Sequence, residues 1–236
     1  MMRLLRPGLV PYGQALAWQL ELRQRLQENL DDNSVGYLIC LQHPPVVTLG
    51  KRGRLDAIFG LEALRDRGVE FFKIDRGGEA TYHGPGQLVI YPIIKLDGLD
   101  IGVVDVIRGL AGCLSTTLAE YGVEAEYDPD CPGLWTTDEA VPHKIASVGM
   151  RVSRGVSTHG AAINLTNDLS PFSLFVPCGM PDSPMARLAD RVESPVDLEA
   201  FTDRFLVHFA AFLDRPFEPD TLEPPPRDRW IPAMPV

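Results

Sequence analysis

Cys178 stands in a setting that suits an exposed nucleophile. It lies between Pro177, which fixes the approach of the chain, and Gly179, which leaves no side-chain bulk behind the sulfur. A thiol near its reference pKa of about 8.5 is mostly protonated at neutral pH, so it needs a base or a cation beside it. Lys144 and His159 are the two candidates for that neighbour. A cysteine paired with a basic lysine is a workable pair for acyl transfer.

The other residues that bear on this pair leave alternatives open. Lysines are usually solvated surface residues, but Lys144 opens an apolar run, which makes its partial burial plausible. Cys131 lies in a turn-rich loop over 128–133, where exposure would make it a weaker rival nucleophile. Cys40 and Cys113 fall in a predicted strand and a predicted helix, and we expect both to be packed.

A glycine-rich stretch over 76–92 is the second chemical feature. It places four glycines around an arginine, a tyrosine and a histidine, between two apolar runs at 69–74 and 88–91 that are typical of strands. One interpretation is a decorated hairpin loop. The other, which we favour, is a loop whose backbone N–H groups and side chains line one wall of a ligand pocket.

The elements that must position these residues alternate between helices and strands. Apolar stripes at helical spacing and short β-branched runs define them. Predicted helices cover 13–30, 55–67 and 105–121, with a fourth starting at Ser194; predicted strands cover 36–41, 46–50, 69–74, 88–91, 134–136, 144–152 and 157–165. With no internal repeat, this order predicts one α/β domain over 1–215, followed by a proline-rich tail over 216–236.

Composition narrows the class of protein. The chain has 236 residues, is 45% hydrophobic and carries a net charge of −10, which disfavours nonspecific nucleic-acid binding. It has no apolar run near the roughly 18 residues of a membrane span, and its N-terminus does not read as a signal peptide. Its four cysteines are widely spaced without a CxxC pair, which argues against a zinc site or a disulfide framework and favours a cytoplasmic protein.

Five short motifs occur in one order along the chain and together resemble the lipoyl(octanoyl) transferases. The resemblance covers more than half of the chain. The motifs are His43-Pro44-Pro45 with Thr48-Leu49-Gly50, Arg76-Gly77-Gly78 with Thr81-Tyr82-His83-Gly84-Pro85-Gly86-Gln87, Lys144-Ile145-Ala146, His159-Gly160 with Asn164, and Pro177-Cys178-Gly179. The stretch between Trp135 and Lys144 departs from the family pattern in being longer and more polar.

The resemblance implies a fold, an activity and partners. The fold is an α/β (α+β) single domain with a mixed sheet flanked by helices, shared with lipoate and biotin protein ligases. The activity is transfer of an octanoyl group from octanoyl-acyl carrier protein to a lysine of lipoyl domains, those of 2-oxoacid dehydrogenases and the glycine cleavage H protein. Cys178 is implied as the acyl acceptor and Lys144 as its acid/base partner, with no cofactor and no metal.

The expected substrate-binding residues come from the glycine-rich stretch and from the two strands after it. They are Arg76, Gly77, Gly78, Thr81, Tyr82, His83, Gly84, Gln87, Ser147, Val148, Gly149, His159, Gly160, Ala161 and Asn164. Two other readings remain open: an ATP-dependent lipoate or octanoate ligase on the same fold, which would not need Cys178, and a non-catalytic acyl-binding module.

Overall fold

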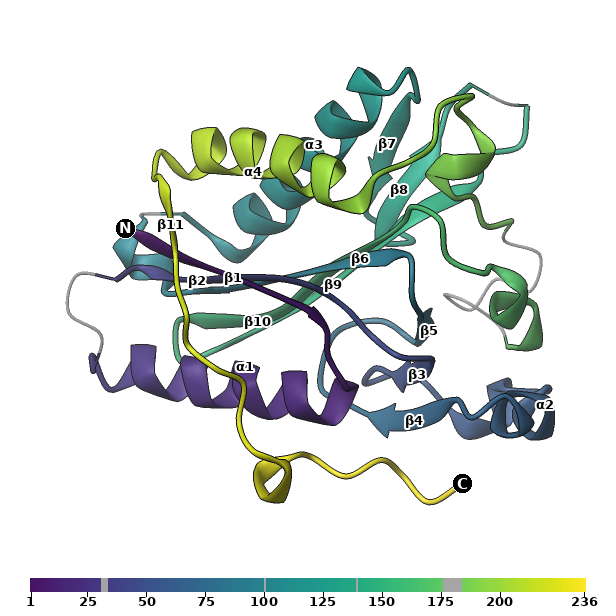
Figure 1. The fold of residues 1–236 in the computed structure, drawn as a ribbon, viewed down its shortest axis with the longest axis horizontal. Helices are drawn as coiled ribbons and strands as arrows, with labels where there is room; N and C mark the ends of the chain where they lie inside the picture. Colours follow the sequence, from purple (N-terminus) through teal and green to yellow (C-terminus); the bar gives the residue numbers. More distant parts are fainter. Residues whose placement is uncertain (31–33, 100, 139, 176–183) are drawn as a thin grey trace.

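Two sheets organise the structure, a computed structural model that describes residues 1–30, 34–99, 101–138, 140–175 and 184–236 (Figure 1). The larger has eight strands in the order β11-β1-β2-β6-β10-β9-β8-β7, and the smaller has the order β4-β3-β5. The strands are β1 (Met2–Leu9), β2 (Gly36–Gln42), β3 (Val46–Leu49), β4 (Glu70–Lys73), β5 (Ala80–His83), β6 (Gln87–Ile94), β7 (Ala125–Asp128), β8 (Gly133–Thr136), β9 (Lys144–Ser153), β10 (Val156–Asn164) and β11 (Phe217–Pro219).

Helices cover both faces of the large sheet. In Figure 1, α1 (Tyr12–Gln27) lies on one face, α3 (Val103–Glu120) and α4 (Leu198–Leu213) lie on the other, and α2 (Leu61–Asp66) sits beside the small sheet. The sheet is mixed, because β1 pairs in parallel with β2 and β11, whereas β6, β9 and β10 pair antiparallel with their neighbours. The predicted single α+β domain with a mixed sheet flanked by helices is therefore confirmed.

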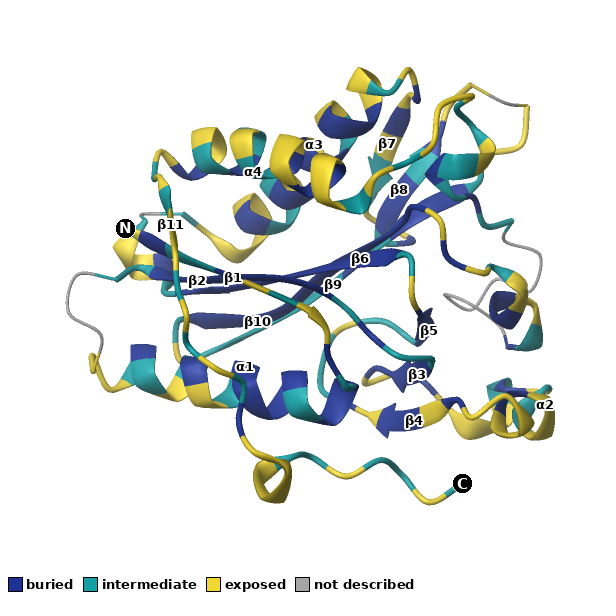
Figure 2. Cartoon of the chain, viewed as in Figure 1, coloured by how far each residue is buried: buried dark blue, intermediate teal, exposed yellow. Residues whose placement is uncertain are grey.

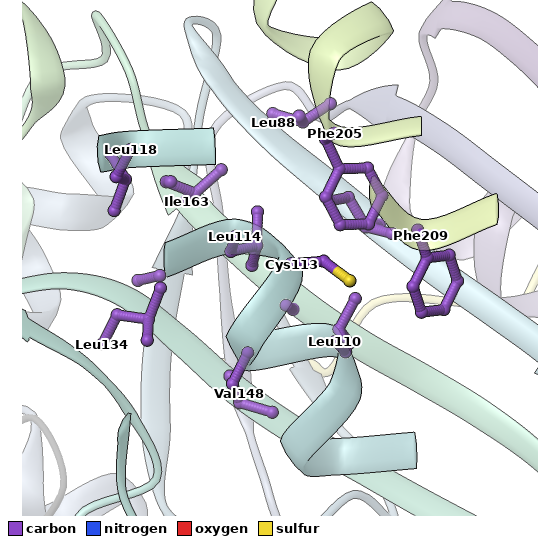
Figure 3. Close-up of a cluster of buried hydrophobic side chains, with 14 of the residues drawn as sticks. Leu88, Leu110, Cys113, Leu114, Leu118, Leu134, Val148, Ile163, Phe205 and Phe209 are labelled. Carbon is purple, nitrogen blue, oxygen red and sulfur yellow. The ribbon is translucent and has the colours of Figure 1, made fainter. Parts of the chain in front are cut away.

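The core follows from the apolar stripes of the helices. Leu110, Leu114 and Leu118 of α3 and Phe205 and Phe209 of α4 are fully buried against the central strands (Figure 3). All eight residues of β6 are buried, as expected for a strand covered on both faces (Figure 2). Burial of this apolar surface stabilises the sheet that carries the cavity described below.

Several predicted boundaries were wrong by a few residues. The first helix ends at Gln27, and Leu30 beyond it is 62% exposed. The helix predicted over 55–67 is a single 3₁₀ turn over Leu55–Ala57 followed by the short α2. The last helix is capped by Asp197, which accepts from the backbone N–H groups of Glu199 and Ala200, and so begins later than Ser194.

The chain ends form strands that the sequence pattern did not predict. In β1 the register shifts between Leu5 and Gly8, and Gly8 adopts a positive φ of 76°, so no clean alternation marks the strand. Beyond residue 215, β11 pairs with β1, and the backbone N–H of Met234 donates to Phe71 O at 2.7 Å. The C-terminal segment therefore crosses from the large sheet to the small one.

Candidate active site

Lys144 is the first residue of β9, and its side chain is buried with 1% of its surface exposed. Its backbone N–H donates to Pro184 O at 2.8 Å, and its carbonyl accepts from the N–H of Ala186 at 2.9 Å. The chain that resumes after residue 183 is therefore anchored directly to Lys144.

The Lys144 amine lies against the loop that leads into β8. Its Nζ is 3.4 Å from Cys131 O and 3.5 Å from Cys131 Sγ, and it stands 5.4 Å from the centroid of the Trp135 ring. Cys131 is only 6% exposed, so the sequence-based expectation that this cysteine could be exposed was wrong. Its thiol instead forms part of the wall around Lys144.

Arg76 organises the glycine-rich loop from inside. Its guanidinium donates to Thr48 O at 2.8 Å, to Glu79 O at 2.9 Å and to Gly77 O at 2.8 Å. Gly78, at a φ of +84°, takes a conformation that favours glycine. The arginine therefore fixes the loop's backbone, and residues 76–81 line the cavity, in keeping with the interpretation of this loop as a pocket wall.

His159 lies in β10 with a φ of +58°, which is uncommon for a residue with a side chain. Its backbone N–H donates to Gln19 Oε1 at 2.8 Å, and its Nε2 lies 3.0 Å from Asp75 Oδ1. Burial lowers the pKa of His159, opposed by the hydrogen bond to Asp75. That hydrogen bond in turn lowers the pKa of the Asp75 carboxyl, whose other oxygen pairs with Arg151. A neutral imidazole that donates to a carboxylate fits these contacts.

Two further histidines are buried and neutral near the same cavity. His43 Nδ1 is 2.7 Å from Val10 O, which can only accept, so its Nε2 accepts from the Tyr91 hydroxyl at 2.8 Å. His83 Nδ1 lies 2.7 Å from Gln87 Oε1. Desolvation lowers the pKa of His43 to about 4 and that of His83 to about 3, so neither is charged at neutral pH.

These features converge on a cavity of about 260 Å³. Twelve of the seventeen predicted site residues line it. They are Arg76, Gly77, Gly78, Thr81, His83, Lys144, Ser147, Val148, Gly149, His159, Gly160 and Ala161. Lys144 and the pair Met150–His159 lie far apart along the cavity wall, because six residues along β9 rise roughly 20 Å.

Of the sixteen predicted site residues that the structure describes, four are not among the lining residues. Tyr82 packs its ring edge-on against Phe172 in a neighbouring core cluster. A Cβ added at Gly84 would fall 2.5 Å from the Tyr82 hydroxyl oxygen. Gln87 donates to Asn164 Oδ1 at 2.9 Å, so this amide pair ties β6 to β10 from behind the cavity. Cys178 falls outside the described residues.

Several lining residues carry no mark in the sequence. Tyr12 comes from α1, Tyr91 from β6 and Ala162 from β10. Cys131, from the loop before β8, is marked in the sequence only as a rival nucleophile. Tyr12 precedes the helix predicted over 13–30, and Tyr91 belongs to a predicted apolar strand, so neither position predicts a role in the cavity. Arg52 belongs to the basic cluster Lys51-Arg52-Gly53-Arg54, which is visible in the sequence. In the structure, Arg52 lines the cavity.

Two features are absent from the parts of the chain that the structure describes. No helix there is long and apolar enough to cross a membrane. No three His, Cys, Asp or Glu side chains among those residues gather as metal ligands would.

Comparison with solved structures shows the fold. Lipoate-protein ligase A bound with ATP superposes with a TM-score of 0.75 at 19% identity, over 94% of this chain and 89% of the other. A putative lipoate protein ligase from T. acidophilum with bound lipoic acid gives a TM-score of 0.72, also at 19% identity and over the same shares of the two chains. At these identities the likeness concerns the fold alone.

Comparison with sequences shows the family. A protein of Solibacter usitatus named octanoyltransferase is 38% identical over 210 residues, which are 88% of this chain and 90% of that one. An octanoyltransferase of Cellvibrio japonicus is 37% identical over 86% of this chain and 88% of its own. The family model described as the lipoyl protein ligase A/B catalytic domain matches residues 11–210, and the chain belongs to that family.

Proposed function

We propose that this protein is an octanoyltransferase, which moves an octanoyl group from octanoyl-acyl carrier protein to a lysine of a lipoyl domain. The observation that carries the proposal is the buried Lys144 at the wall of a partly apolar cavity, in a chain whose relatives bear that name over nearly its whole length. A thioester donor is already activated, so the reaction requires neither a nucleotide nor a metal.

Cys178 is the proposed acyl acceptor, and the described chain on both sides of it supports its pairing with Lys144. Phe175, three residues before it, is buried in the same apolar cluster against which Met185 packs. Met185 forms a bridge with Lys144 itself. The residues described before and after Cys178 are therefore linked to Lys144 through this cluster.

The two candidate bases for the thiol are separated by the geometry of the hairpin. His159 lies opposite Met150, roughly 20 Å along β9 from Lys144. Met185 follows Cys178 in the chain, and its β-bridge is with Lys144. The proposed pair is therefore Cys178 with Lys144. The His159–Asp75 pair then belongs to the far end of the cavity, where it holds the glycine-rich loop and β9 together through Arg151.

The proposed mechanism moves one proton back and forth. Neutral Lys144 takes the proton of the Cys178 thiol, and the thiolate attacks the carbonyl carbon of the octanoyl thioester. As the tetrahedral intermediate collapses, the carrier thiol leaves with the proton from Lys144. The amine of the acceptor lysine then attacks the octanoyl-enzyme, Lys144 takes its proton, and the Cys178 thiol leaves with that proton.

The cavity wall suits a linear acyl chain. Val89, Ala161 and Ala162 present small apolar groups, while the buried histidines stay neutral and add no charge beside the alkyl chain. We propose that the twelve lining residues predicted from the sequence bind the substrate. Four predicted residues that do not line the cavity are proposed to stabilise the glycine-rich loop and the strands instead: Tyr82, Gly84, Gln87 and Asn164.

The cellular partners of this reaction are proposed on the same basis. The proposed acceptors are the lipoyl domains of 2-oxoacid dehydrogenases and the glycine cleavage H protein, and the proposed compartment is the cytoplasm. The proposal gives the protein no role in binding nucleic acid, in keeping with its net charge of −10.

The reaction itself separates a transferase from a ligase on this fold. Purified protein is incubated with a lipoyl domain and octanoyl-acyl carrier protein without nucleotide, and in parallel with free octanoate and ATP. The proposal expects a lipoyl domain heavier by one octanoyl group only in the first mixture. Octanoylation with pyrophosphate release only in the second mixture would make the protein a ligase, and no modification in either would favour an acyl-binding module.

A further inference from the structure

The amine of Lys144 is held from three sides by one short segment. Cys131 supplies its carbonyl oxygen at 3.4 Å and its sulfur at 3.5 Å, and the face of the Trp135 ring lies 5.4 Å from Nζ. Gly133 supplies room, because a Cβ there would fall 2.4 Å from Lys144 Cε. We call Cys131, Gly133 and Trp135 the lysine cradle.

Trp135 also fixes the oxygen that the amine contacts. Its indole Nε1–H donates to Cys131 O at 3.2 Å, so the indole and the Lys144 amine share one acceptor. Trp135 reaches this place because the register of β8 and β9 shifts between Leu134 and Trp135, which sets Trp135 opposite Lys144. The tryptophan therefore acts twice, by its ring on the amine and by its N–H on the carbonyl.

The contacts of the cradle are neutral ones. A carbonyl oxygen, a thiol sulfur and an aromatic face each attract an amine, but none brings the full counter-charge of a carboxylate. Such contacts fix where the amine points while leaving it able to exchange a proton. A long lysine side chain has several rotatable bonds, so holding its end in one place is what a proton transfer over hydrogen-bond distance requires.

We propose that Trp135 and Cys131 are positioning residues for Lys144. The cradle holds the amine at the wall of the cavity, so that each of its proton transfers starts from one fixed geometry. This inference rests on the proposed role of Lys144 as acid and base. It adds the residues through which the protein controls that lysine.

The first test removes the indole N–H but keeps an aromatic ring. Trp135→Phe is compared with Trp230→Phe, which makes the same change where the indole donates to Pro225 O in the C-terminal segment. A misplaced reacting group costs on the order of tenfold to a hundredfold in rate. We expect Trp135→Phe to lower kcat by about tenfold with KM for the donor within about twofold, and Trp230→Phe to keep both.

The thiol is tested by a matched pair of cysteine variants. Cys131→Ala removes the sulfur beside Lys144, and Cys113→Ala removes a buried sulfur from α3. We expect a several-fold loss of kcat in the first and none in the second beyond what lower stability explains, with Cys131→Ser restoring part of the loss. A Cys131→Ala enzyme with unchanged kcat would remove the thiol from the proposal.

A double-mutant cycle separates positioning from general damage. If Trp135 acts through Lys144, Trp135→Phe lowers the alkylation rate of Cys178 by iodoacetamide when Lys144 is present and changes it less than twofold in a Lys144→Met background. Equal losses in both backgrounds would overturn the proposal, because Trp135 would then act without the lysine.

A chemical readout on Lys144 keeps the test independent of the octanoyl reaction. Reductive methylation with formaldehyde and cyanoborohydride, followed by peptide mass mapping, reports how far the amine is held. We expect Lys144 to be protected in the parent protein and in Trp230→Phe, and to react at least tenfold faster in Trp135→Leu. Equal protection in Trp135→Leu would overturn the cradle even in an active enzyme. Loss of protection in a protein without octanoyl transfer would uphold the cradle while rejecting the proposed function.

Discussion

Lys144 is almost completely buried, and its contacts with the lysine cradle are made to neutral groups, which suits its proposed role as acid and base. Lys144→Arg therefore tests its role directly. Arginine keeps a positive charge but does not give up its proton, so we expect Lys144→Arg to lose on the order of a hundredfold or more in kcat, nearly as much as Lys144→Ala. Steady-state kinetics with octanoyl-acyl carrier protein decide this. A Lys144→Arg enzyme near the parent rate would leave lysine only an electrostatic role.

The buried neutral histidines predict how stability depends on pH. Because the folded pKa of His43 is lowered to about 4, the unfolded chain takes up a proton near pH 6.5 and the folded chain does not. The contribution of His43 to the free energy of unfolding is present above pH 6.5 and is lost as pH falls toward 4. At pH 5 the loss is about 2 kcal/mol.

Urea unfolding at pH 7.5 and pH 5 measures this effect. We expect His43→Gln to lose less stability between the two values than the parent protein, by about 2 kcal/mol. His208→Gln, at a histidine on α4 that pairs with Glu120, serves as the control. Equal losses in the parent and in His43→Gln would contradict the neutral, buried state of His43.

At the scale of elements, the pairing of β10 with β6 leaves no room for a side chain at Gly160. A Cβ at Gly160 would lie 2.0 Å from Ile90 O and 2.7 Å from Pro92 Cδ, so β6 would have to move. We expect Gly160→Ala to lower the free energy of unfolding by about 2 kcal/mol or more. Gly112→Ala, in α3 with nothing within 4 Å, should raise it by about 0.5–1 kcal/mol. Urea unfolding compares the two, and a Gly160→Ala protein as stable as the parent would contradict the described pairing.

The same elements show what a sequence can and cannot predict. The helix stripe of Leu110, Leu114 and Leu118 is local, and it predicted α3 well. The strand β1 was missed because Arg3, Arg6 and Pro7 interrupt any alternation, and its pairing with β2 and β11 is decided across the whole chain.

The candidate site likewise has features that the local sequence predicts and features that depend on the folded structure. Lys144 drew attention because of its residue type and its place at the head of an apolar run. The cavity contribution of Tyr12 and Tyr91 exists only after distant elements meet. The contact of Cys131 with Lys144 joins neighbouring segments, and it depends on the register of β8 on β9, which shifts between Leu134 and Trp135. No spacing in the sequence marks that shift, so the lysine cradle could not be predicted.

At the scale of the whole molecule, we expect charge to control encounter with the proposed donor, octanoyl-acyl carrier protein. The protein carries −10, and acyl carrier proteins are acidic as a family, so productive docking requires a local positive patch. Arg54 pairs with Asp56, and Arg151 pairs with Asp75. Within the Lys51–Arg54 cluster, Arg52 lines the cavity and Lys51 is exposed beside it, which leaves these two as the expected contact.

Reversing those two charges tests the patch. For Lys51→Glu with Arg52→Glu we expect KM for the carrier-borne substrate to rise by about fivefold to tenfold at low salt, with kcat nearly unchanged. With octanoyl-pantetheine, a small donor that lacks the carrier protein, we expect the variant to have the same kcat and KM as the parent protein. The control is Arg204→Glu with Arg215→Glu, which makes the same charge change on and after α4. Equal losses with both substrates would mean that the pair supports the pocket, and a loss as large in the control would mean that total charge decides.

The measurement that bears most directly on the account is the site of the acyl group on the enzyme. Intact mass after mixing with octanoyl-acyl carrier protein, followed by peptide mapping, locates it among the four cysteines of the chain. The account predicts one octanoyl group on Cys178, absent in Cys178→Ser and present in Cys131→Ser. An octanoyl group on Cys131, whose sulfur is the one that the structure places 3.5 Å from Lys144, would contradict it.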